Sequence, residues 1–310
     1  MGSSEINVHE PVLLAEAIAA LCVRRDGFYV DATYGRGGHA RAILELLGPE
    51  GALLVIDRDP QAVAHARATI GADPRVSVRQ ATFDGVGEFV AARSAAGVLF
   101  DLGVSSPQLD DASRGFSFMR EGPLDMRMDP TSGESAADFI AHATEQEIVS
   151  VIFEFGEERF ARRIANAIVL ARASGRISTT TELAAIVGRA VPKREPGKNP
   201  ATRTFQALRM RVNRELALIE RALDAAIEVL AVGGRLAVIS FHSLEDRLVK
   251  RHLRRVSEED PVWRGMPGAP DAALPRLAMV GRAVRAGVQE LAGNPRARSA
   301  TLRVAERVRA

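Results

Sequence analysis

Short apolar runs alternate with amphipathic stretches over the first third of the chain. Runs of nearly continuous apolar character predict parallel strands that are buried on both faces, at residues 28–33, 52–57, 76–81 and 97–102. Apolar residues at helical spacing predict helices between them, at 38–47, 60–70 and 86–92. This repeated order predicts a doubly wound α/β fold, with a parallel sheet and helices on both of its faces.

The alternation stops after the fourth run, and the segment 110–211 contains a loop followed by helical patterns. Thr144 and Glu147 form a capping box at the start of one helix. Apolar residues keep helical spacing over 157–173 and over 181–190. The segment therefore has the character of a helical insertion.

The strand-helix order resumes after the insertion. A helical pattern leads to a turn at Gly233 and Gly234, and the segment 235–241 predicts a strand. Ser243 and Asp246 are expected to cap a basic helix, and residues 301–306 predict a last strand. The pattern thus predicts one domain made of two separated segments, and a second domain inserted into it: 1–109 with 212–310, and 110–211.

The 310 residues are 46% hydrophobic, which is enough for a full core, and the net charge is only +2. Cys22 is the single cysteine, so no disulfide can form within the chain, and we expect it to be a small buried residue. The polar start of the sequence lacks the pattern of a signal peptide, and no apolar run is long enough for a membrane span. We therefore expect a cytoplasmic protein that does not act in a membrane.

Basic residues gather in two runs. In the first, eight basic residues accompany a single acid, Glu195: Arg189, Lys193, Arg194, Lys198, Arg203, Arg209, Arg211 and Arg214. The second has no acid among its members: Arg247, Lys250, Arg251, Arg254 and Arg255. Each run could neutralise RNA phosphates or could be a solvated helix face, and charge alone does not decide between these interpretations.

A glycine-rich loop follows the first predicted strand. Glycine allows a sharp turn and a close approach to a ligand, and the helix that follows offers free amide groups to an anion. Gly35, Gly37 and Ala40 fit the dinucleotide fingerprint, and Asp57 ends the next strand where that fingerprint places its ribose-binding acid. An NAD-dependent oxidoreductase is therefore one interpretation, and a purely structural glycine turn is another.

Two further residues bear on the cofactor without identifying it. Every adenosine cofactor has a ribose diol that suits a carboxylate acceptor, so Asp57 fits more than one of them. Phe83 follows the third strand and is placed to cover an adenine face, although a lone aromatic residue is more often part of the core.

The fourth predicted strand ends in a group of polar residues: Asp101, Ser105, Ser106 and Gln108. Ligands of open α/β sheets bind at this carboxyl edge. Such acceptors suit the methylation of an exocyclic base amine, because they orient its hydrogens and receive the proton released after transfer. We therefore interpret Asp101, Ser105 and Ser106 as candidate catalytic residues, whereas a merely polar loop would explain Asp101 alone.

Long and unusual strings in the same order resemble the MraW/RsmH family over nearly the whole chain. They are Asp31-Ala-Thr-Tyr-Gly-Arg-Gly-Gly-His39, Asp57-Arg-Asp-Pro60, Asp101-Leu-Gly-Val-Ser-Ser-Pro-Gln-Leu-Asp110, Arg114-Gly-Phe-Ser-Phe118, Gly122-Pro-Leu-Asp-Met-Arg-Met-Asp129, Gly156-Glu-Glu-Arg-Phe160, Asn199-Pro-Ala-Thr-Arg-Thr-Phe-Gln206, Ile239-Ser-Phe-His-Ser-Leu-Glu-Asp-Arg247 and Asn294-Pro-Arg-Ala-Arg-Ser299.

The resemblance implies a class I methyltransferase (Rossmann-like) sheet with an inserted helical domain, S-adenosylmethionine as methyl donor, and N4 of a cytidine in the decoding region of small-subunit (16S) ribosomal RNA as target. Seven positions match cofactor-contacting positions of the family: Gly37, Gly38, His39, Asp57, Phe83, Asp101 and Gln108. Asp101 and Gln108 are thus assigned to the cofactor, which is compatible with a place near the target amine. Because Gln108 follows the proline where many amino-methyltransferases have an aromatic residue, a stacking platform must come from elsewhere, with three candidates: Phe116, Phe118 and Phe241.

His242 could act as a base, but direct transfer to an amine needs no prior deprotonation, so it could equally orient its neighbours. No short-spaced cluster of ligands predicts a metal site. We expect in-line methyl transfer to a base taken out of its stack, either in free RNA or in an assembling 30S particle. The remaining alternatives are the oxidoreductase, for which no hydride-transfer domain is found, and a noncatalytic RNA-binding module.

Overall fold

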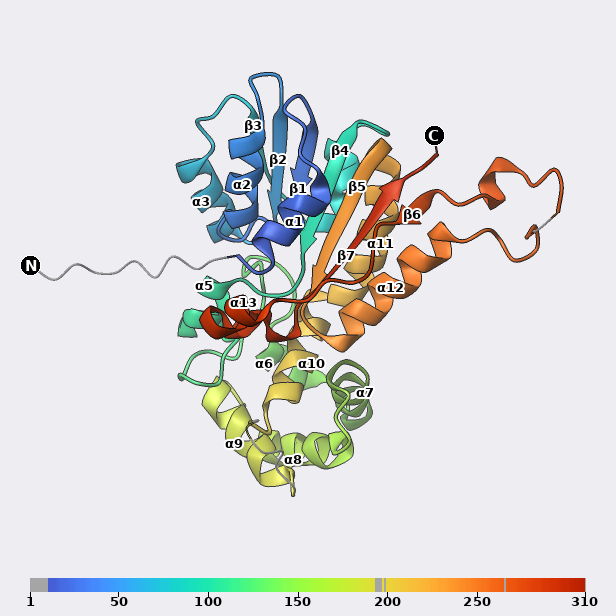
Figure 1. Ribbon diagram of the computed structural model, residues 1–310. Coiled ribbons are helices and arrows are strands. Elements are labelled where there is room, and N and C mark those ends of the chain that lie inside the picture. The colour runs from blue at the N-terminus through green and yellow to red at the C-terminus, as the bar shows by residue number, and fades with distance from the viewer. Residues whose placement is uncertain (1–10, 193–196, 198, 265, 310) are drawn as a thin grey trace, which may run out of the picture. The chain divides into compact units, whose positions relative to one another are not determined.

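The structure is a computed structural model, and it describes residues 11–309 except 193–196, 198 and 265 (Figure 1). The chain forms two compact units, Met1–Gly103 with Leu216–Ala310, and Val104–Glu215. Their junctions lie a few residues outside the expected insertion 110–211, so the polar residues that follow Gly103 belong to the smaller unit.

Seven strands form one sheet in the described part of the larger unit, in the order β3-β2-β1-β4-β5-β7-β6. Their bounds are β1 Phe28–Asp31, β2 Ala52–Asp57, β3 Val76–Gln80, β4 Ala95–Asp101, β5 Leu230–Ser240, β6 Leu277–Met279 and β7 Thr301–Arg307. The first five are parallel, and β7 pairs antiparallel with both β5 and β6. This order, with its antiparallel β7, is that of class I methyltransferases and confirms the predicted fold class.

Helices cover both faces of the sheet (Figure 1). One face packs against α4 Val86–Phe89, α11 Glu215–Val229 and α12 Ser243–Ser257, and the other packs against α1 Leu14–Leu21, α2 Gly38–Leu46 and α3 Pro60–Thr69. Successive residues of a strand point to opposite faces, so Phe100 enters the first core and Leu99 the second. Three 3-10 turns and a short helix complete this unit: η1 Phe83–Gly85, η3 Asp271–Ala273, η4 Pro295–Ser299 and α13 Val288–Gly293.

Several predicted details of the larger unit are wrong. The glycine pair Gly233 and Gly234 lies inside β5, where the pairing register with β4 shifts, and does not precede the strand as a turn. The N-cap of α12 is His242, not Ser243. Cys22 is exposed and ends α1 in a left-handed conformation, so the expectation of a buried residue fails.

The smaller unit is helical and has its own core. Its elements are α5 Ser106–Asp110, η2 Ala112–Arg114, α6 Ala136–His142, α7 Glu145–Gly156, α8 Ala161–Ser174, α9 Thr180–Ala190 and α10 Thr202–Asn213. The capping box at α7 is confirmed, with Glu147 N–H donating to Thr144 Oγ1 and Thr144 N–H to Glu147 Oε2. The predicted helix 157–173 begins later, because Glu157 adopts a left-handed conformation (φ +48°) and ends α7.

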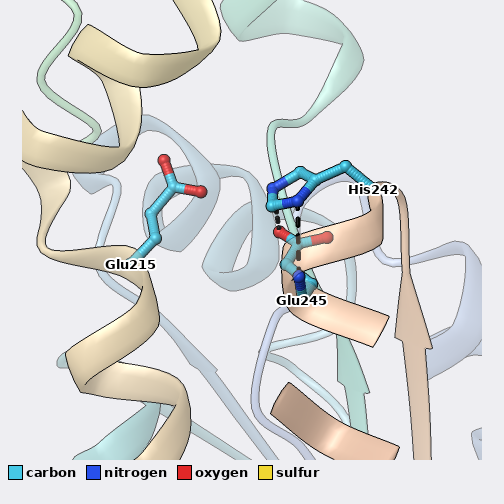
Figure 2. A group of neighbouring side chains, drawn as sticks. All are labelled: Glu215, His242 and Glu245. Atoms are coloured by element: carbon cyan, nitrogen blue, oxygen red, sulfur yellow. Dashed lines mark hydrogen bonds and ion pairs between the residues drawn. The ribbon is translucent and has the colours of Figure 1, made fainter. Parts of the chain in front are cut away.

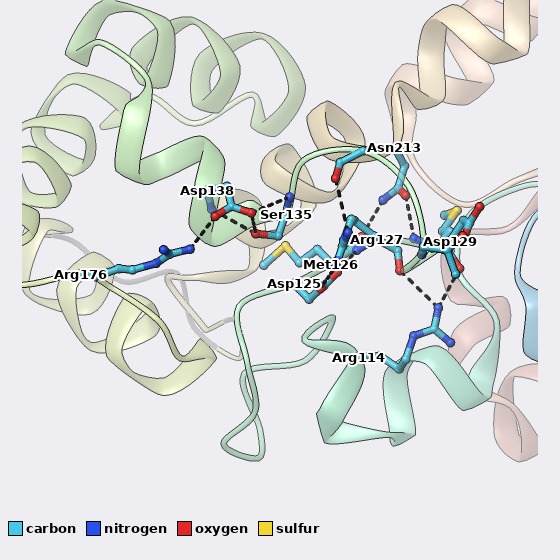
Figure 3. A network of polar contacts seen from close by, with 12 residues as sticks. Arg114, Asp125, Met126, Arg127, Asp129, Ser135, Asp138, Arg176 and Asn213 are labelled. Atoms are coloured by element: carbon cyan, nitrogen blue, oxygen red, sulfur yellow. Dashed lines mark hydrogen bonds and ion pairs between the residues drawn. The ribbon is translucent and has the colours of Figure 1, made fainter.

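A polar network holds the segment 122–129 of the smaller unit, which is mostly irregular (Figure 3). Asn213 Nδ2 donates to the carbonyl of Met126 at 2.7 Å, and Asn213 Oδ1 accepts from Met128 N–H at 2.8 Å. The buried Arg114 donates to the carbonyls of Arg127 and Met128. These bonds keep Met126 in a left-handed conformation (φ +63°) that a side chain of its size rarely adopts.

A membrane-spanning segment would need a long apolar helix, and none of the helices in the described residues has the required length and hydropathy.

Candidate active site

Three carboxyl groups lie at the carboxyl edge of the sheet in the larger unit. Asp31, Asp57 and Asp101 end β1, β2 and β4, and β1 lies between the other two strands. Asp31 is buried, and Oδ1 accepts a hydrogen bond from Thr33 N–H at 3.1 Å. Burial, opposed by the bond from Thr33, raises the pKa of Asp31 to about 7, with a further contribution from the negative charge of Asp57.

Asp57 is bonded to the backbone through both of its carboxylate oxygens. Oδ2 accepts from Gly35 N–H and Oδ1 accepts from Asp59 N–H, each at 2.8 Å. Burial raises the pKa of Asp57 to about 6, although these bonds act in the opposite direction. Each carboxylate oxygen has a second lone pair, so the group can also accept bonds from a ribose diol.

The loop after β1 needs its glycines. Gly35 and Gly37 have φ of +56° and +72°, in the left-handed region that favours glycine. A Cβ on Gly37 would lie 2.4 Å from the Tyr34 ring, and a Cβ on Gly38 would lie 1.9 Å from Cγ of Pro11. The backbone at Gly37 and Gly38 therefore packs too closely against Tyr34 and Pro11 to leave room for a side chain at these two positions.

His39 lies at the start of α2 and is buried. Nε2 is 3.2 Å from the carbonyl of Val12, and Nδ1 is 3.6 Å from Asp101 Oδ2. Burial lowers the pKa of His39 to about 4, so the ring is neutral at pH 7. Because a carbonyl can only accept, we assign the proton to Nε2, which leaves the lone pair of Nδ1 facing Asp101.

Asp101 combines exposure with an unsatisfied oxygen. Its backbone N–H donates to Thr33 Oγ1 at 2.6 Å, and 26% of its side chain is exposed. Oδ1 is buried and has no hydrogen-bond partner among the described residues. Burial, and then the charges of Asp31 and Glu245, raise the pKa of Asp101 well above its usual range. Asp101 can therefore hold a proton near neutral pH and accept a hydrogen bond from a ligand.

The other members of the predicted catalytic group belong to the smaller unit. Ser105 is the N-cap of α5, and its N–H donates to Oε1 of the buried Gln108 at 3.0 Å. Ser106 is the first residue of that helix. Asp101 is part of the larger unit, and the catalytic and cofactor-binding roles of Ser105, Ser106 and Gln108 stay predictions.

The aromatic candidates have structural contacts of their own. Phe83 is partly buried on the core, with its ring centroid 5.9 Å from that of Phe100 in an edge-on arrangement. Phe116 is buried in the smaller unit, and Phe118 lies edge-on to Phe205 at 5.0 Å. The structure therefore supports the core interpretation of Phe83, while its contact with an adenine stays a prediction.

His242 is engaged with the buried Glu245 (Figure 2). His242 Nδ1 accepts from Glu245 N–H at 3.3 Å, and His242 Nε2 lies 3.1 Å from Glu245 Oε1. Glu245 Oε2 accepts from Phe241 N–H at 2.8 Å. These contacts favour an orienting role for His242, which caps α12 and fixes the end of β5.

Sequence reasoning assigned no role to Asp31 or Glu245. Both carry a signal that was available: Asp31 is the acid directly before the glycine loop, and Glu245 lies three residues after the N-cap of a helix, where a capping acid is common. The full burial of these two acids could not be predicted from the sequence, because it depends on packing against strands that are distant in the sequence.

In both basic runs, several arginines are paired with carboxylates and do not present free positive charge. In the second run, Arg251, Arg254 and Arg255 lie 3.5, 2.6 and 3.9 Å from Glu220, Glu258 and Asp224. This favours an ion-paired, solvated face.

In the first run, Arg209 forms two bonds to Glu215, at 2.8 and 2.7 Å, and Arg203 lies 3.8 Å from Glu158. Lys193, Arg194 and Lys198 lie outside the described residues, as does Glu195. Arg211 lies 3.8 Å from Glu134, so three arginines of this run have acidic partners among the described residues, and its role in RNA binding stays a prediction.

The sheet order, with its antiparallel β7, is that of a class I methyltransferase, and the glycine loop after β1 and the carboxyl group that ends β2 lie where this class binds S-adenosylmethionine. Residues present at the strand ends fit this cofactor, since Asp57 is bonded to the loop and Asp101 has an unsatisfied buried oxygen.

The chain belongs to the MraW methylase family, whose model matches residues 6–308. It is 57% identical over 305 residues to the ribosomal RNA small subunit methyltransferase H of Halorhodospira halophila. The alignment covers 97% of this chain and 94% of that protein. It is 54% identical to the protein of the same name from Thioalkalivibrio sulfidiphilus, over 99% of this chain and 100% of the relative. A SAM-dependent O-methyltransferase structure from Thermotoga maritima aligns with 96% of this chain and 65% of its own, at 9% identity and a TM-score of 0.42.

Family membership decides between the interpretations that the sequence left open. The chain is a methyltransferase with S-adenosylmethionine as cofactor, as predicted, and neither an NAD-dependent oxidoreductase nor a noncatalytic RNA-binding module.

Proposed function

We propose that this chain methylates the exocyclic N4 amine of a cytidine in the decoding region of small-subunit (16S) ribosomal RNA. Relatives that are more than half identical over nearly the whole chain are named as small-subunit ribosomal RNA methyltransferases, which supports the RNA substrate. The motif strings of the MraW/RsmH family support the cytidine amine. A ribosomal RNA substrate also agrees with a cytoplasmic location. The proposed methyl transfer involves no metal ion.

The observation that carries the proposal is the carboxyl group of Asp101, with its buried and unsatisfied Oδ1 at the edge of the sheet. The lone pair of an exocyclic amine is delocalised into the base, so the amine is a poor nucleophile. An acceptor that binds one of its hydrogens orients the amine and favours a lone pair aimed at the methyl group. Asp101 offers such an acceptor, and Ser105 and Ser106 are further candidates.

The remaining residues bind and orient the reactants. Asp57 would hold the ribose diol of the cofactor, with Gly35, Gly37 and Gly38 forming the loop against it. S-adenosylmethionine supplies the electrophilic methyl group when bound. Direct transfer to a neutral amine produces a positively charged product, so a proton must leave after transfer. Asp101 would receive this proton when it is ionised, because its raised pKa makes the carboxylate a strong base, and the lone pair of His39 Nδ1, 3.6 Å from Asp101 Oδ2, faces the carboxyl group that results.

Methyl transfer to RNA tests the proposal. Purified protein is incubated with S-adenosylmethionine labelled in its methyl group and with two substrates, free 16S RNA and 30S particles, and the RNA is digested to nucleosides. We expect N4-methylcytidine, and the comparison shows which substrate is accepted. A product methylated on a ring carbon or on a ribose oxygen would contradict the amine mechanism.

A further inference from the structure

We propose that a pocket in the smaller unit, formed by α7 and the start of α8, binds a nucleotide of single-stranded RNA. The base would stack on Phe153, and Arg159, Arg162 and Arg163 would contact phosphates. The inference rests on the proposed function in one respect, namely that the substrate is RNA. It adds a subsite made of the string Gly156 to Phe160 and its neighbours, for which methyl transfer itself provides no role.

The pocket has a volume of about 520 Å³, which is room for a nucleotide. Its aromatic and charged lining comes from adjoining helices and the turn between them: Phe153, Glu154, Arg159, Phe160, Arg162 and Arg163. Glu154 is the one acid in this lining, against three arginines. The pocket therefore complements a negatively charged ligand.

Phe153 is exposed over 62% of its surface, although it follows the fully buried Ile152 on the same helix. Phe153 lines a pocket that also contains three arginines, so its ring is accessible to a base that enters there. Phe160 presents a second aromatic face, on which the Arg159 guanidinium lies 4.7 Å from the ring centroid. Stacked bases and guanidinium groups on aromatic faces are typical of single-strand RNA sites.

The three arginines have no carboxylate partner in the described part of the chain, unlike those of α12. Arg251, Arg254 and Arg255 each lie within 4 Å of an acid. An unpaired arginine can release counterions to a phosphate without breaking an ion pair. The pocket is therefore a better candidate for phosphate binding than the second basic run.

The turn that carries Arg159 is held in place. The buried Glu158 accepts a hydrogen bond from Phe160 N–H at 2.8 Å and lies 3.8 Å from Arg203. A Cβ on Gly156 would lie 2.8 Å from the carbonyl of Arg203, so α7 and α10 pack closely here. These contacts hold the turn between α7 and α8 and give the pocket a preformed shape.

The test uses the full chain and a fluorescent single-stranded oligocytidylate as probe. Phe153→Leu keeps an apolar side chain but removes the ring, and we expect it to weaken binding roughly tenfold with an unchanged salt dependence. Arg162→Gln combined with Arg163→Gln should reduce the slope of log affinity against log salt by about 0.7 for each lost contact. Leu170→Ala, which changes an exposed apolar residue of α8 outside the pocket, is the control and should bind as the unaltered protein does.

Two readouts separate this inference from the proposed function. Thermal unfolding and the affinity for S-adenosylmethionine should not change in these variants, and the KM for 16S RNA should rise. If the unaltered protein methylates RNA but the variants bind and react normally, the subsite is wrong and the proposed function stands. If the variants instead lose affinity only for an acidic peptide, the pocket is a protein-binding site and the inference is overturned.

Discussion

Gly35 and Asp57 are joined by a hydrogen bond of 2.8 Å, from the amide of the glycine loop to Oδ2 of the acid that ends the neighbouring strand. The residue expected to bind the ribose of the cofactor therefore also holds the loop expected to bind the rest of it. Loss of this acid should affect both parts of the cofactor site together.

Asp57→Ala should lower the affinity for S-adenosylmethionine by roughly ten- to a hundredfold, since a hydrogen bond to a charged group contributes about 1.5–3 kcal/mol. Titration calorimetry measures this, and circular dichroism checks that the variant is folded. Asp57→Asn keeps one acceptor oxygen, so its affinity for S-adenosylmethionine should lie between the affinities of the unaltered protein and of Asp57→Ala. Unchanged affinity in a folded Asp57→Ala protein would remove this residue from the site.

Asp101→Asn should reduce turnover on RNA more than stability, because it preserves the shape of the side chain but replaces one acceptor oxygen by a donor. A loss of about 2–4 kcal/mol in transition-state stabilisation is typical of a positioned group. Single-turnover methylation measures the effect. Asp26→Asn, a change at an exposed acid before β1, is the control. Near-normal turnover of Asp101→Asn would leave Ser105, Ser106 or backbone carbonyls as the acceptors.

The raised pKa of Asp31 predicts a pH-dependent stability. The folded protein holds this proton up to about pH 7, whereas the unfolded chain releases it near pH 4, so the contribution of Asp31 to stability falls as pH rises through this window. His39 acts in the opposite direction, because its lowered pKa means that the unfolded chain binds its proton first as pH falls below about 6.5.

Urea unfolding of the cofactor-free protein and of Asp31→Asn, each between pH 5 and pH 8, isolates the effect of Asp31. The difference in free energy of unfolding between the two proteins should shift by a few kcal/mol in favour of Asp31→Asn as pH rises. A constant offset between them would mean that the carboxyl group titrates normally.

Asn213→Ala should destabilise the smaller unit by about 3 kcal/mol, because it leaves the carbonyl of Met126 and the amide of Met128 without their partner. Asn213→Asp keeps the acceptor for Met128 and should cost less. Hydrogen exchange of the amides around 126–128 measures the change. Unchanged protection in Asn213→Ala would show that the network is held by Arg114 alone.

The central strands could be predicted because they are buried on both faces. The predicted run 52–57 coincides with β2, since a short and continuous apolar run is typical of a strand in the middle of a parallel sheet. β6 was not predicted, because it has three residues and only Leu277 of them is buried. The bulge at Gly233 was interpreted as a turn, since a glycine pair has the same local signature in both.

The position of the candidate site at the strand ends could be predicted from the sequence. The ion pairs that its charged residues form could not. The strand order brings Asp31, Asp57 and Asp101 to one edge. Asp57 ends its predicted strand, and Asp31 and Asp101 lie near the ends of theirs. The partner of an arginine cannot be read from a charge run, however. Arg255 meets Asp224 from the preceding helix, and only the packing of α11 against α12 brings them together.

The sheet has a consequence for synthesis of the chain on the ribosome. β4 and β5 are neighbours in the sheet, but the whole smaller unit lies between them in the sequence. At ordinary rates of elongation, β5 is therefore synthesised about ten seconds after β4. During this interval the edge of β4 is unpaired, and Ala95 to Phe100 are side chains that the finished fold buries. A nascent chain of this protein should therefore need a chaperone most when it has been extended as far as Val229.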